Sequence, residues 1–196
     1  MIDEDSYVAG NPALVASGLA VVLTGCSGGG KSTLLAELAR RGHGVRPEAG
    51  RQIVREQMQL AGDALPWVDP GKFVEFAASR LFHFFNTTHP QGRPVFFDRG
   101  LVDLTSFLEL KKLAVPPALL RALSVYRFAE TVFVTPPWRE IYVDEAERSK
   151  SFDEACGEYD ALVAGYRRAG YVLVEVPRVG VRARADFIEE LLTTSR

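Results

Sequence analysis

Apolar residues along the chain follow two patterns, short continuous runs and longer stretches in which they recur every three or four positions. A continuous run rich in β-branched residues is typical of a strand buried on both faces, and the wider spacing is typical of an amphipathic helix. Five segments are predicted as strands: residues 19–23, 44–48, 94–98, 131–134 and 171–176. Helices are predicted around them, over residues 31–42, 50–60, 71–88, 101–112, 151–170 and 185–192, with a further short helix from residue 116.

This alternation of strands and helices predicts an α/β fold of three layers, in which helices cover both faces of a parallel five-stranded sheet. Ligands of such folds bind at the carboxyl ends of the strands. Charged residues follow several of the predicted strands at this edge, among them Glu48, Asp98 and Arg178. Residues 1–17 are small and polar, so we expect a flexible or loosely docked lead-in before a single domain over residues 18–196.

Residues 25–32 have the sequence Gly-Cys-Ser-Gly-Gly-Gly-Lys-Ser, which fits the phosphate-binding pattern G-x-x-x-x-G-K-[ST]. A predicted strand precedes it and a predicted helix follows it, as this P-loop requires. Its amides and the helix N-terminus face the phosphates, the lysine reaches the β- and γ-phosphates, and the serine hydroxyl ligates Mg²⁺. The predicted nucleotide-binding residues are Gly25, Cys26, Ser27, Gly28, Gly29, Gly30, Lys31, Ser32 and Thr33.

Asp98 and Arg99 end the third predicted strand. An aspartate at the end of an apolar strand is the expected Walker-B ligand of Mg²⁺, so Ser32 and Asp98 are the candidate metal-binding residues. Hydrolysing motor ATPases usually place a glutamate after this aspartate to activate water, whereas this chain has a cation. Arg99 therefore favours transfer to a bound acceptor, with the guanidinium neutralising the transferred phosphoryl group; a strand-end salt bridge is the alternative.

Glu48 follows the second predicted strand. As a catalytic residue it could accept the proton of an acceptor hydroxyl. It could equally hydrogen-bond an acceptor sugar, or pair with Arg51, which we also place among the substrate-binding candidates. Cys26 has two interpretations as well: a helix N-terminus lowers a thiol pKa and favours redox sensitivity, or the position tolerates variation.

Two further arginines are candidates. Arg80 shares the apolar face of the helix over residues 71–88 with Phe73, Ala77 and Leu81. It either snorkels to solvent or reaches the acceptor pocket. Arg148 lies in a polar stretch at about residues 137–152, which we expect to be a lid over the phosphates, with Arg148 stabilising transferred charge; a charged surface loop is the alternative.

Composition narrows the function classes. The 196 residues are 47% hydrophobic and carry a formal net charge of -2, so no whole-chain basic field attracts nucleic acid or anionic membrane. No apolar run approaches the ~20 residues of a membrane span, and the acidic start lacks the basic region of a signal peptide. With only Cys26 and Cys156 present, we expect no structural disulfide and a cytoplasmic location, without nucleic-acid partners or stable membrane association.

Absent motifs exclude two classes of nucleotide-binding protein. The guanine-reading Asn-Lys-x-Asp motif is missing, because the two asparagines, Asn11 and Asn86, are followed by Pro12 and Thr87. An ordinary small GTPase is therefore not expected. A transporter ATPase is not expected either, since no Leu-Ser-Gly-Gly-Gln signature occurs.

Motifs beyond the P-loop carry a resemblance to a known family. They are Pro47-Glu48-Ala49-Gly50-Arg51, Phe97-Asp98-Arg99-Gly100 with Asp103, Pro136 to Tyr142, Asp144 to Arg148, and Gly170-Tyr171 with Glu175-Val176-Pro177. On these residues the chain, from about residue 19 to 190, resembles the AAA-domain P-loop proteins similar to the ribosylnicotinamide kinase domain of NadR. The resemblance implies a P-loop NTPase fold of nucleoside-kinase type, with sheet order 2-3-1-4-5, Mg²⁺, and ATP or GTP. Such proteins include kinases and a eukaryotic protein that binds GTP and phosphatidic acid.

The sequence therefore predicts a Mg²⁺-dependent, ATP-using phosphotransferase that acts on a small hydroxyl-bearing metabolite such as a nucleoside. Lys31, Glu48, Asp98, Arg99 and Arg148 are the predicted catalytic residues. The alternatives are a nucleotide-dependent switch that binds a protein or lipid, and a slow ATPase. The acceptor, the preference for ATP over GTP and the oligomeric state have no readable signal in the sequence.

Overall fold

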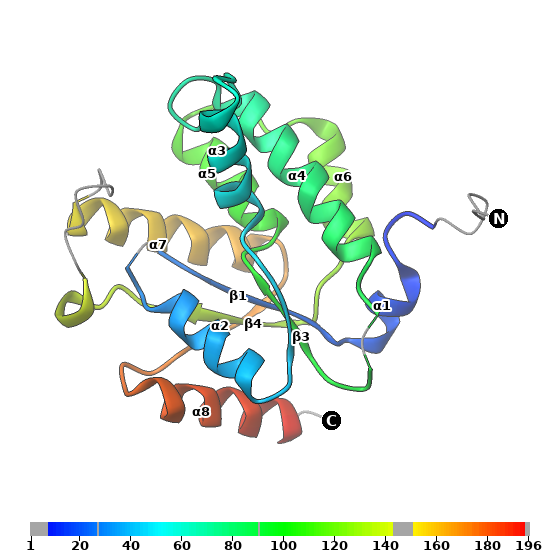
Figure 1. Ribbon diagram of the computed structural model, residues 1–196, viewed down its shortest axis with the longest axis vertical. Coiled ribbons are helices and arrows are strands. Elements are labelled where there is room, and N and C mark those ends of the chain that lie inside the picture. Colours follow the sequence, from blue (N-terminus) through cyan, green and yellow to red (C-terminus); the bar gives the residue numbers. More distant parts are fainter. Residues whose placement is uncertain (1–7, 27, 90, 143–150, 195–196) are drawn as a thin grey trace.

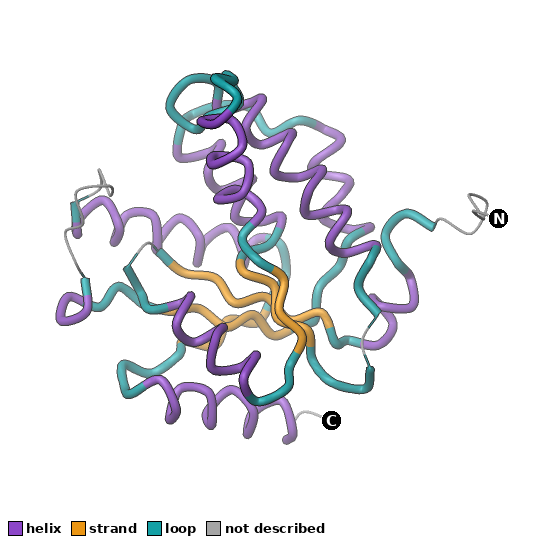
Figure 2. The backbone as a smooth tube through the Cα atoms, in the orientation of Figure 1, coloured by secondary structure: helices purple, strands orange, loops and turns teal. Residues whose placement is uncertain are grey.

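The structure, a computed structural model, describes residues 8–26, 28–89, 91–142 and 151–194. Figures 1 and 2 show a sheet flanked by helices. The strands are β1 (Ala20–Gly25), β2 (Gly44–Arg46), β3 (Val95–Asp98), β4 (Thr131–Thr135) and β5 (Val172–Glu175). The helices are α1 (Pro12–Ser17), α2 (Lys31–Arg40), α3 (Ala49–Gln59), α4 (Pro70–Asn86), α5 (Leu101–Leu110), α6 (Pro117–Val125), α7 (Phe152–Arg168) and α8 (Val181–Thr194), with a 3₁₀ turn at Arg139–Ile141.

The strand order is β2-β3-β1-β4-β5, and the paired strands run parallel. The predicted order and parallel sheet are confirmed. β1 is the central strand, paired with β3 on one side and β4 on the other, and every one of its residues is buried. The loop that follows β1 therefore begins in the middle of the sheet, between the carboxyl ends of its two neighbours.

The sheet has a hydrophobic core on each of its two faces. Successive residues of a strand point to opposite faces, so each strand contributes side chains to both cores. Val21, Leu23 and Phe96 pack under α2 and α8. Val22 and Phe97 pack against the helices on the other face. Figure 1 shows α2 and α8 on one side of the sheet and α4, α5 and α7 on the other, which confirms the three layers.

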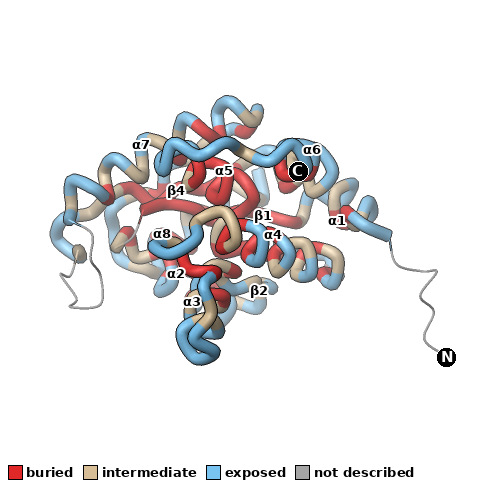
Figure 3. Tube along the Cα trace, turned by 90° about the horizontal axis from the view of Figure 1, so that it is seen from above, coloured by how far each residue is buried: buried red, intermediate tan, exposed pale blue. Residues whose placement is uncertain are grey.

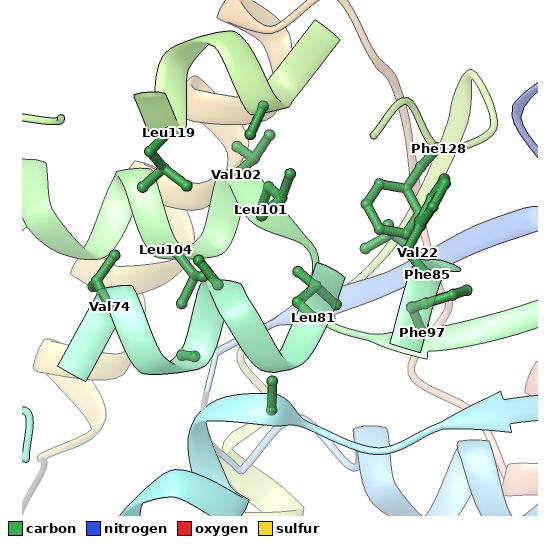
Figure 4. Close-up of a cluster of buried hydrophobic side chains, with 14 of the residues drawn as sticks. Val22, Val74, Leu81, Phe85, Phe97, Leu101, Val102, Leu104, Leu119 and Phe128 are labelled. Atoms are coloured by element: carbon green, nitrogen blue, oxygen red, sulfur yellow. The ribbon is translucent and has the colours of Figure 1, made fainter. Parts of the chain in front are cut away.

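The larger core is aromatic where α4 meets the sheet. Phe85 packs edge-on against Phe128 at 5.0 Å between ring centroids, and Phe97 packs against the same ring at 5.1 Å. Figure 4 shows these rings beside Val22, with Leu81 and Leu104 contributed by α4 and α5. Figure 3 shows the buried residues concentrated along β1 and β4 and on the inner sides of the helices. Within the described part of the chain, no helix is long and apolar enough to cross a membrane.

The second half of the expected lead-in differs from the prediction. Residues 12–17 form α1, and Leu14 is buried in the larger core. Asn11 caps this helix by accepting a hydrogen bond from the amide of Leu14, and its side-chain amide donates to the carbonyl oxygens of Phe85 and Thr88. An asparagine followed by proline is a helix-start signal, and here it also fixes α1 to the end of α4.

Candidate functional site

The P-loop joins β1 to α2, which begins at Lys31. Its glycines are required by backbone geometry, since Gly25, Gly28 and Gly30 have φ values of 140°, 81° and 73°. A Cβ on Gly25 would lie 2.4 Å from the carbonyl oxygen of Thr135 on β4. Only glycine therefore fits at the point where the loop leaves β1. Ser27 lies outside the described residues.

Lys31 and Asp98, the predicted phosphate-binding and metal-binding residues, form an ion pair. Asp98 ends β3 beside β1, and the Lys31 Nζ atom lies 2.9 Å from its Oδ1 atom; both side chains are at least nine-tenths buried. The Asp98 Oδ1 atom has this cation beside it but accepts no hydrogen bond. Either the lysine or a divalent cation can therefore bind to Asp98 Oδ1.

Ser32 and Asp98 border the same two cavities. Among the described residues, no group of three or more acidic, histidine or cysteine side chains could hold a metal by itself. Mg²⁺ does not require one, because it is usually bound through one or two carboxylates together with substrate phosphates. A hydroxyl and an under-satisfied carboxylate oxygen beside a phosphate-binding loop fit that ion.

Arg99 is surrounded by carboxylates. Its backbone is left-handed, with φ 71°. The guanidinium lies 3.3 Å from Glu48, 3.0 Å from Asp103 and 3.2 Å from Glu158. Burial lowers the pKa of Arg99, but the Coulombic attraction of these carboxylates, Glu48 foremost, outweighs it and raises the pKa. The guanidinium is therefore a fixed cation.

Asp103 anchors this cluster to the core. Its buried carboxylate accepts hydrogen bonds from Thr24 Oγ1 at 2.5 Å, from the Gly100 amide at 2.8 Å and from Tyr166 Oη at 2.5 Å. Burial, followed by the charge of Asp103, raises the pKa of Tyr166 well above its usual value, which keeps this phenol a donor. The network holds Arg99 in place at the carboxyl ends of β1 and β3.

Glu48 directly precedes α3, with its side chain 21% exposed. Its carboxylate lies 3.6 Å from Arg51 and 3.3 Å from Arg99. The pairing with Arg51 that we considered from the sequence is therefore present. Glu48 and Arg99 also line a common cavity, so a ligand in that cavity can contact the carboxylate.

These residues line one large cavity of about 1210 Å³. The P-loop from Gly28 to Thr33 borders one part, and Glu48, Arg51 and Arg99 border another. Arg80 does not line it, because its guanidinium pairs instead with Glu56 at 2.9 Å. The predicted lid residue Arg148 lies outside the described residues.

Asp103, Glu158 and Arg184 were missed as site residues by sequence reasoning. Asp103 follows Arg99 by four positions at the start of a helix, which is a usable local signal for an ion pair. Glu158 and Arg184 reach the site from α7 and α8, and no spacing in the sequence connects them to the P-loop.

Arg184 is buried, with 3% of its surface exposed. It donates hydrogen bonds to the carbonyl oxygens of Gly29 at 3.0 Å and Gly30 at 3.4 Å. Burial lowers its pKa, and its guanidinium lies 5.8 Å from the centre of the Trp138 ring. Through these two hydrogen bonds, Arg184 connects α8 to the P-loop and stabilises the loop.

We expect Arg184→Met to lower the affinity for ATP about tenfold and to lower the melting temperature, since hydrogen bonds from a charged donor contribute roughly 1.5–3 kcal/mol each. Isothermal titration with ATP and Mg²⁺ measures the affinity. Arg182→Met, an exposed arginine on the same helix, is the matched control and should bind as the wild type does. Equal ATP affinity of Arg184→Met and wild type would show that the loop does not depend on this clamp.

Cys26 is not the activated thiol that a helix N-terminus would produce. Burial, followed by the negative charge of Glu158, raises the pKa of Cys26 to about 11. The direction of this shift is opposite to the lowered thiol pKa that the redox interpretation requires, so that interpretation is not supported. Cys26 and Cys156 are both free.

Known structures share this fold. The chain is similar to the NadR protein in complex with NR, with a TM-score of 0.60, 18% identity and coverage of 87% of this chain and 50% of that chain, so it spans half of that protein's length. It is similar to thymidylate kinase from Ehrlichia chaffeensis at a TM-score of 0.55, 15% identity and coverage of 90% and 98%. It is also similar to shikimate kinase from Acinetobacter baumannii in complex with shikimate. The TM-score is 0.54, the identity is 13%, and the match covers 90% of this chain and 93% of that chain. No curated protein matches the chain.

At these identities the similarity shows the fold, which is a P-loop fold shared with kinases. The sequence itself matches the family model described as AAA domain over residues 20–184, from the first residue of β1 to the buried arginine on α8. The match includes the P-loop, the Asp98-Arg99 strand end and the surrounding carboxylates. The chain therefore belongs to the AAA domain family of P-loop proteins.

Proposed function

We propose that the protein is a Mg²⁺-dependent phosphotransferase that transfers the γ-phosphoryl group of ATP to the hydroxyl of a small metabolite, a nucleoside in particular. The observation that carries this proposal is the position of Glu48 and Arg99. They follow β2 and β3, lie 3.3 Å apart, and share a cavity with Lys31 and the P-loop. This pairing of a carboxylate and a cation supports the proposal that an acceptor hydroxyl approaches the γ-phosphate in line between them.

In this mechanism the P-loop amides and Lys31 hold the β- and γ-phosphates and neutralise their charge. Mg²⁺, held by Ser32 and Asp98, would supply further charge neutralisation across the same phosphates. Glu48 orients the acceptor hydroxyl and accepts its proton. Arg99, fixed by its three carboxylates, stabilises the charge that spreads over the transferred group, and Arg148 is proposed to assist from the lid.

A nucleotide-dependent switch and a slow ATPase are the alternative functions. The kinase fold of the similar structures and the cation following Asp98 support transfer over hydrolysis. GTP remains an alternative donor. The free cysteines suit the reducing cytoplasm that we propose as the location.

We expect Asp98→Asn to lose most of the strengthening of ATP binding by Mg²⁺ while still binding ATP without metal, because the carboxylate serves the metal and not the nucleobase. Titrations of both proteins with ATP, with Mg²⁺ and with EDTA, measure this coupling. If Mg²⁺ strengthens binding equally in the two proteins, Asp98 does not hold the metal.

The proposed function is tested by ADP formation in a coupled assay, with and without each acceptor of a nucleoside panel that includes ribosylnicotinamide. We expect at least one acceptor to raise the rate well above the rate with water alone. An ATP-binding protein whose ADP rate no acceptor raises is an ATPase or a switch.

A further inference from the structure

A second cavity, the α2–α3 cavity, has a volume of about 330 Å³ and lies between these two helices at the end of β2. Ser32 and Asp98, at its inner end, also border the large cavity, so it opens beside the nucleotide site. The residues of its outer part, among them Ala39 and Arg55, do not line the large cavity. The proposed function does not use this outer part.

The α3 wall of the α2–α3 cavity carries three residues with hydrogen-bond donors. Arg51 and Arg55 are one helical turn apart on α3, and Gln52 lines the cavity with them. Gln52 Oε1 accepts a hydrogen bond from Arg80 at 2.9 Å, which identifies the other terminal atom of this amide as the donor nitrogen. Within the described part of the chain, neither this nitrogen nor the Arg55 guanidinium has a hydrogen-bond or ion-pair partner.

The opposite wall, on α2, offers no charge to these donors. It consists of Leu35, Ala36 and Ala39. The acidic residue in this part of α2, Glu37, does not line the cavity, and its carboxylate accepts hydrogen bonds from two neighbouring arginines. The donors on α3 therefore face apolar side chains across the cavity.

The two carboxylates at the inner end of the cavity already have cations beside them. Lys31 lies 2.9 Å from Asp98, and Arg99 lies 3.3 Å from Glu48. Arg51 also pairs with Glu48, but at 3.6 Å, which is beyond the usual length of a hydrogen bond. These carboxylates therefore do not compensate the positive charge of the outer part of the cavity.

An anion bound in the outer part would stabilise α3. Like charges four positions apart on a helix, such as Arg51 and Arg55, repel each other. In addition, the first turn of α3 contains no acidic residue, although the helix dipole favours negative charge there. A guanidinium group also presents its donors in a planar fork that matches the oxygens of a phosphate group.

We propose that the α2–α3 cavity is a binding site for a phosphate group, either free or carried by a small organic molecule. Arg51 and Arg55 bind its charge, the Gln52 amide donates to one of its oxygens, and the alanines of α2 leave room for an organic body. Two guanidinium groups favour a phosphate dianion over a singly charged carboxylate. A phosphorylated acceptor belongs to this ligand class, so the site can respond to the product of the proposed reaction as well as to free phosphate.

Titration calorimetry tests the site on the protein saturated with Mg²⁺ and a non-hydrolysable ATP analogue, because the analogue fills the P-loop. The probes are orthophosphate, ribose 5-phosphate and acetate. We expect a phosphate compound to bind about tenfold or more tightly than acetate, as an additional charge-assisted contact provides. Tighter binding of ribose 5-phosphate than of orthophosphate identifies an organic phosphate as the ligand, and the reverse order identifies free phosphate. Binding of neither phosphate compound, or equal binding of acetate, would overturn the inference.

Arg55→Gln and Ala39→Leu locate the bound phosphate. Both positions are exposed and lie outside the large cavity, so both variants should fold and bind the ATP analogue as the wild type does. The first removes a charge, and the second fills the cavity without changing any charge; we expect each to weaken phosphate binding about tenfold or more. Arg182→Gln on α8 and Ala118→Leu on α6, exposed positions outside both cavities, are the matched controls and should bind phosphate normally.

Unchanged phosphate affinity in either Arg55→Gln or Ala39→Leu would place the anion elsewhere and overturn the inference. Because no phosphoryl transfer takes place in these titrations, their outcome is independent of the kinase function. A protein that binds phosphate between α2 and α3 and transfers none keeps this inference and loses the proposed function.

Discussion

Lys31→Ala should abolish tight binding of ATP and all phosphoryl transfer while the protein remains folded. The lysine is buried beside the P-loop, and its Nζ atom lies 2.9 Å from Asp98. Without it, the charges of the β- and γ-phosphates and of Asp98 face one another without the compensating cation. Charge-assisted hydrogen bonds of this kind contribute roughly 1.5–3 kcal/mol, so the removal of each one lowers the affinity about ten- to hundredfold.

Isothermal titration with ATP and Mg²⁺ measures this decrease, and circular dichroism checks the fold. Lys111→Ala is a matched control, because Lys111 lines the same cavity at the far end of α5 and should not touch the phosphates. Unchanged ATP affinity and turnover in Lys31→Ala would contradict the assignment of the P-loop as the nucleotide-binding site.

Glu48→Gln and Arg99→Lys should spare ATP binding and lower the rate of phosphoryl transfer about 10²–10³-fold, as is typical when one positioned charge is removed at the transition state. Glutamine keeps the shape of Glu48 and cannot accept the proton. Lysine keeps the charge of Arg99 but lacks its planar fork, which here contacts three carboxylates.

Arg99→Ala is a harsher test of the same cluster. It leaves Glu48, Asp103 and Glu158 without their shared cation, and breaking a buried ion pair costs about 3–5 kcal/mol. A melting curve of that variant is therefore required, to separate a lower rate of transfer from a loss of folded protein. If Glu48→Gln and Arg99→Lys transfer phosphate at the wild-type rate with every acceptor, the cluster is structural.

Local signals in the sequence were sufficient for the P-loop and for the sheet. The apolar runs predict the strands because most residues of a strand buried on both faces are apolar. The glycines and Lys31 identify the loop from spacing alone. Glu48, Asp98 and Arg99 were predicted as site residues because they follow or end predicted strands, and the carboxyl ends of parallel strands lie at one edge of the sheet.

Contacts between distant segments were not predictable in the same way. Glu158 lies 59 positions from its partner Arg99, and Arg184 lies 155 positions from Gly29. The helical period placed Arg80 on the apolar face of α4, but the buried stripe runs through Val74, Ala78 and Phe85 as well. This rotation directs Arg80 to Glu56 on α3, away from the cavity.

Transfer of labelled phosphate from [γ-³²P]ATP tests the central claim most directly. The protein is incubated with Mg²⁺ and each nucleoside of the panel, and the label is separated into ATP, inorganic phosphate and phosphorylated acceptor. The proposed function predicts label in a phosphorylated nucleoside, with Glu48→Gln reducing it about 10²-fold or more. Label found only in inorganic phosphate with every acceptor, or remaining in ATP throughout, would contradict it.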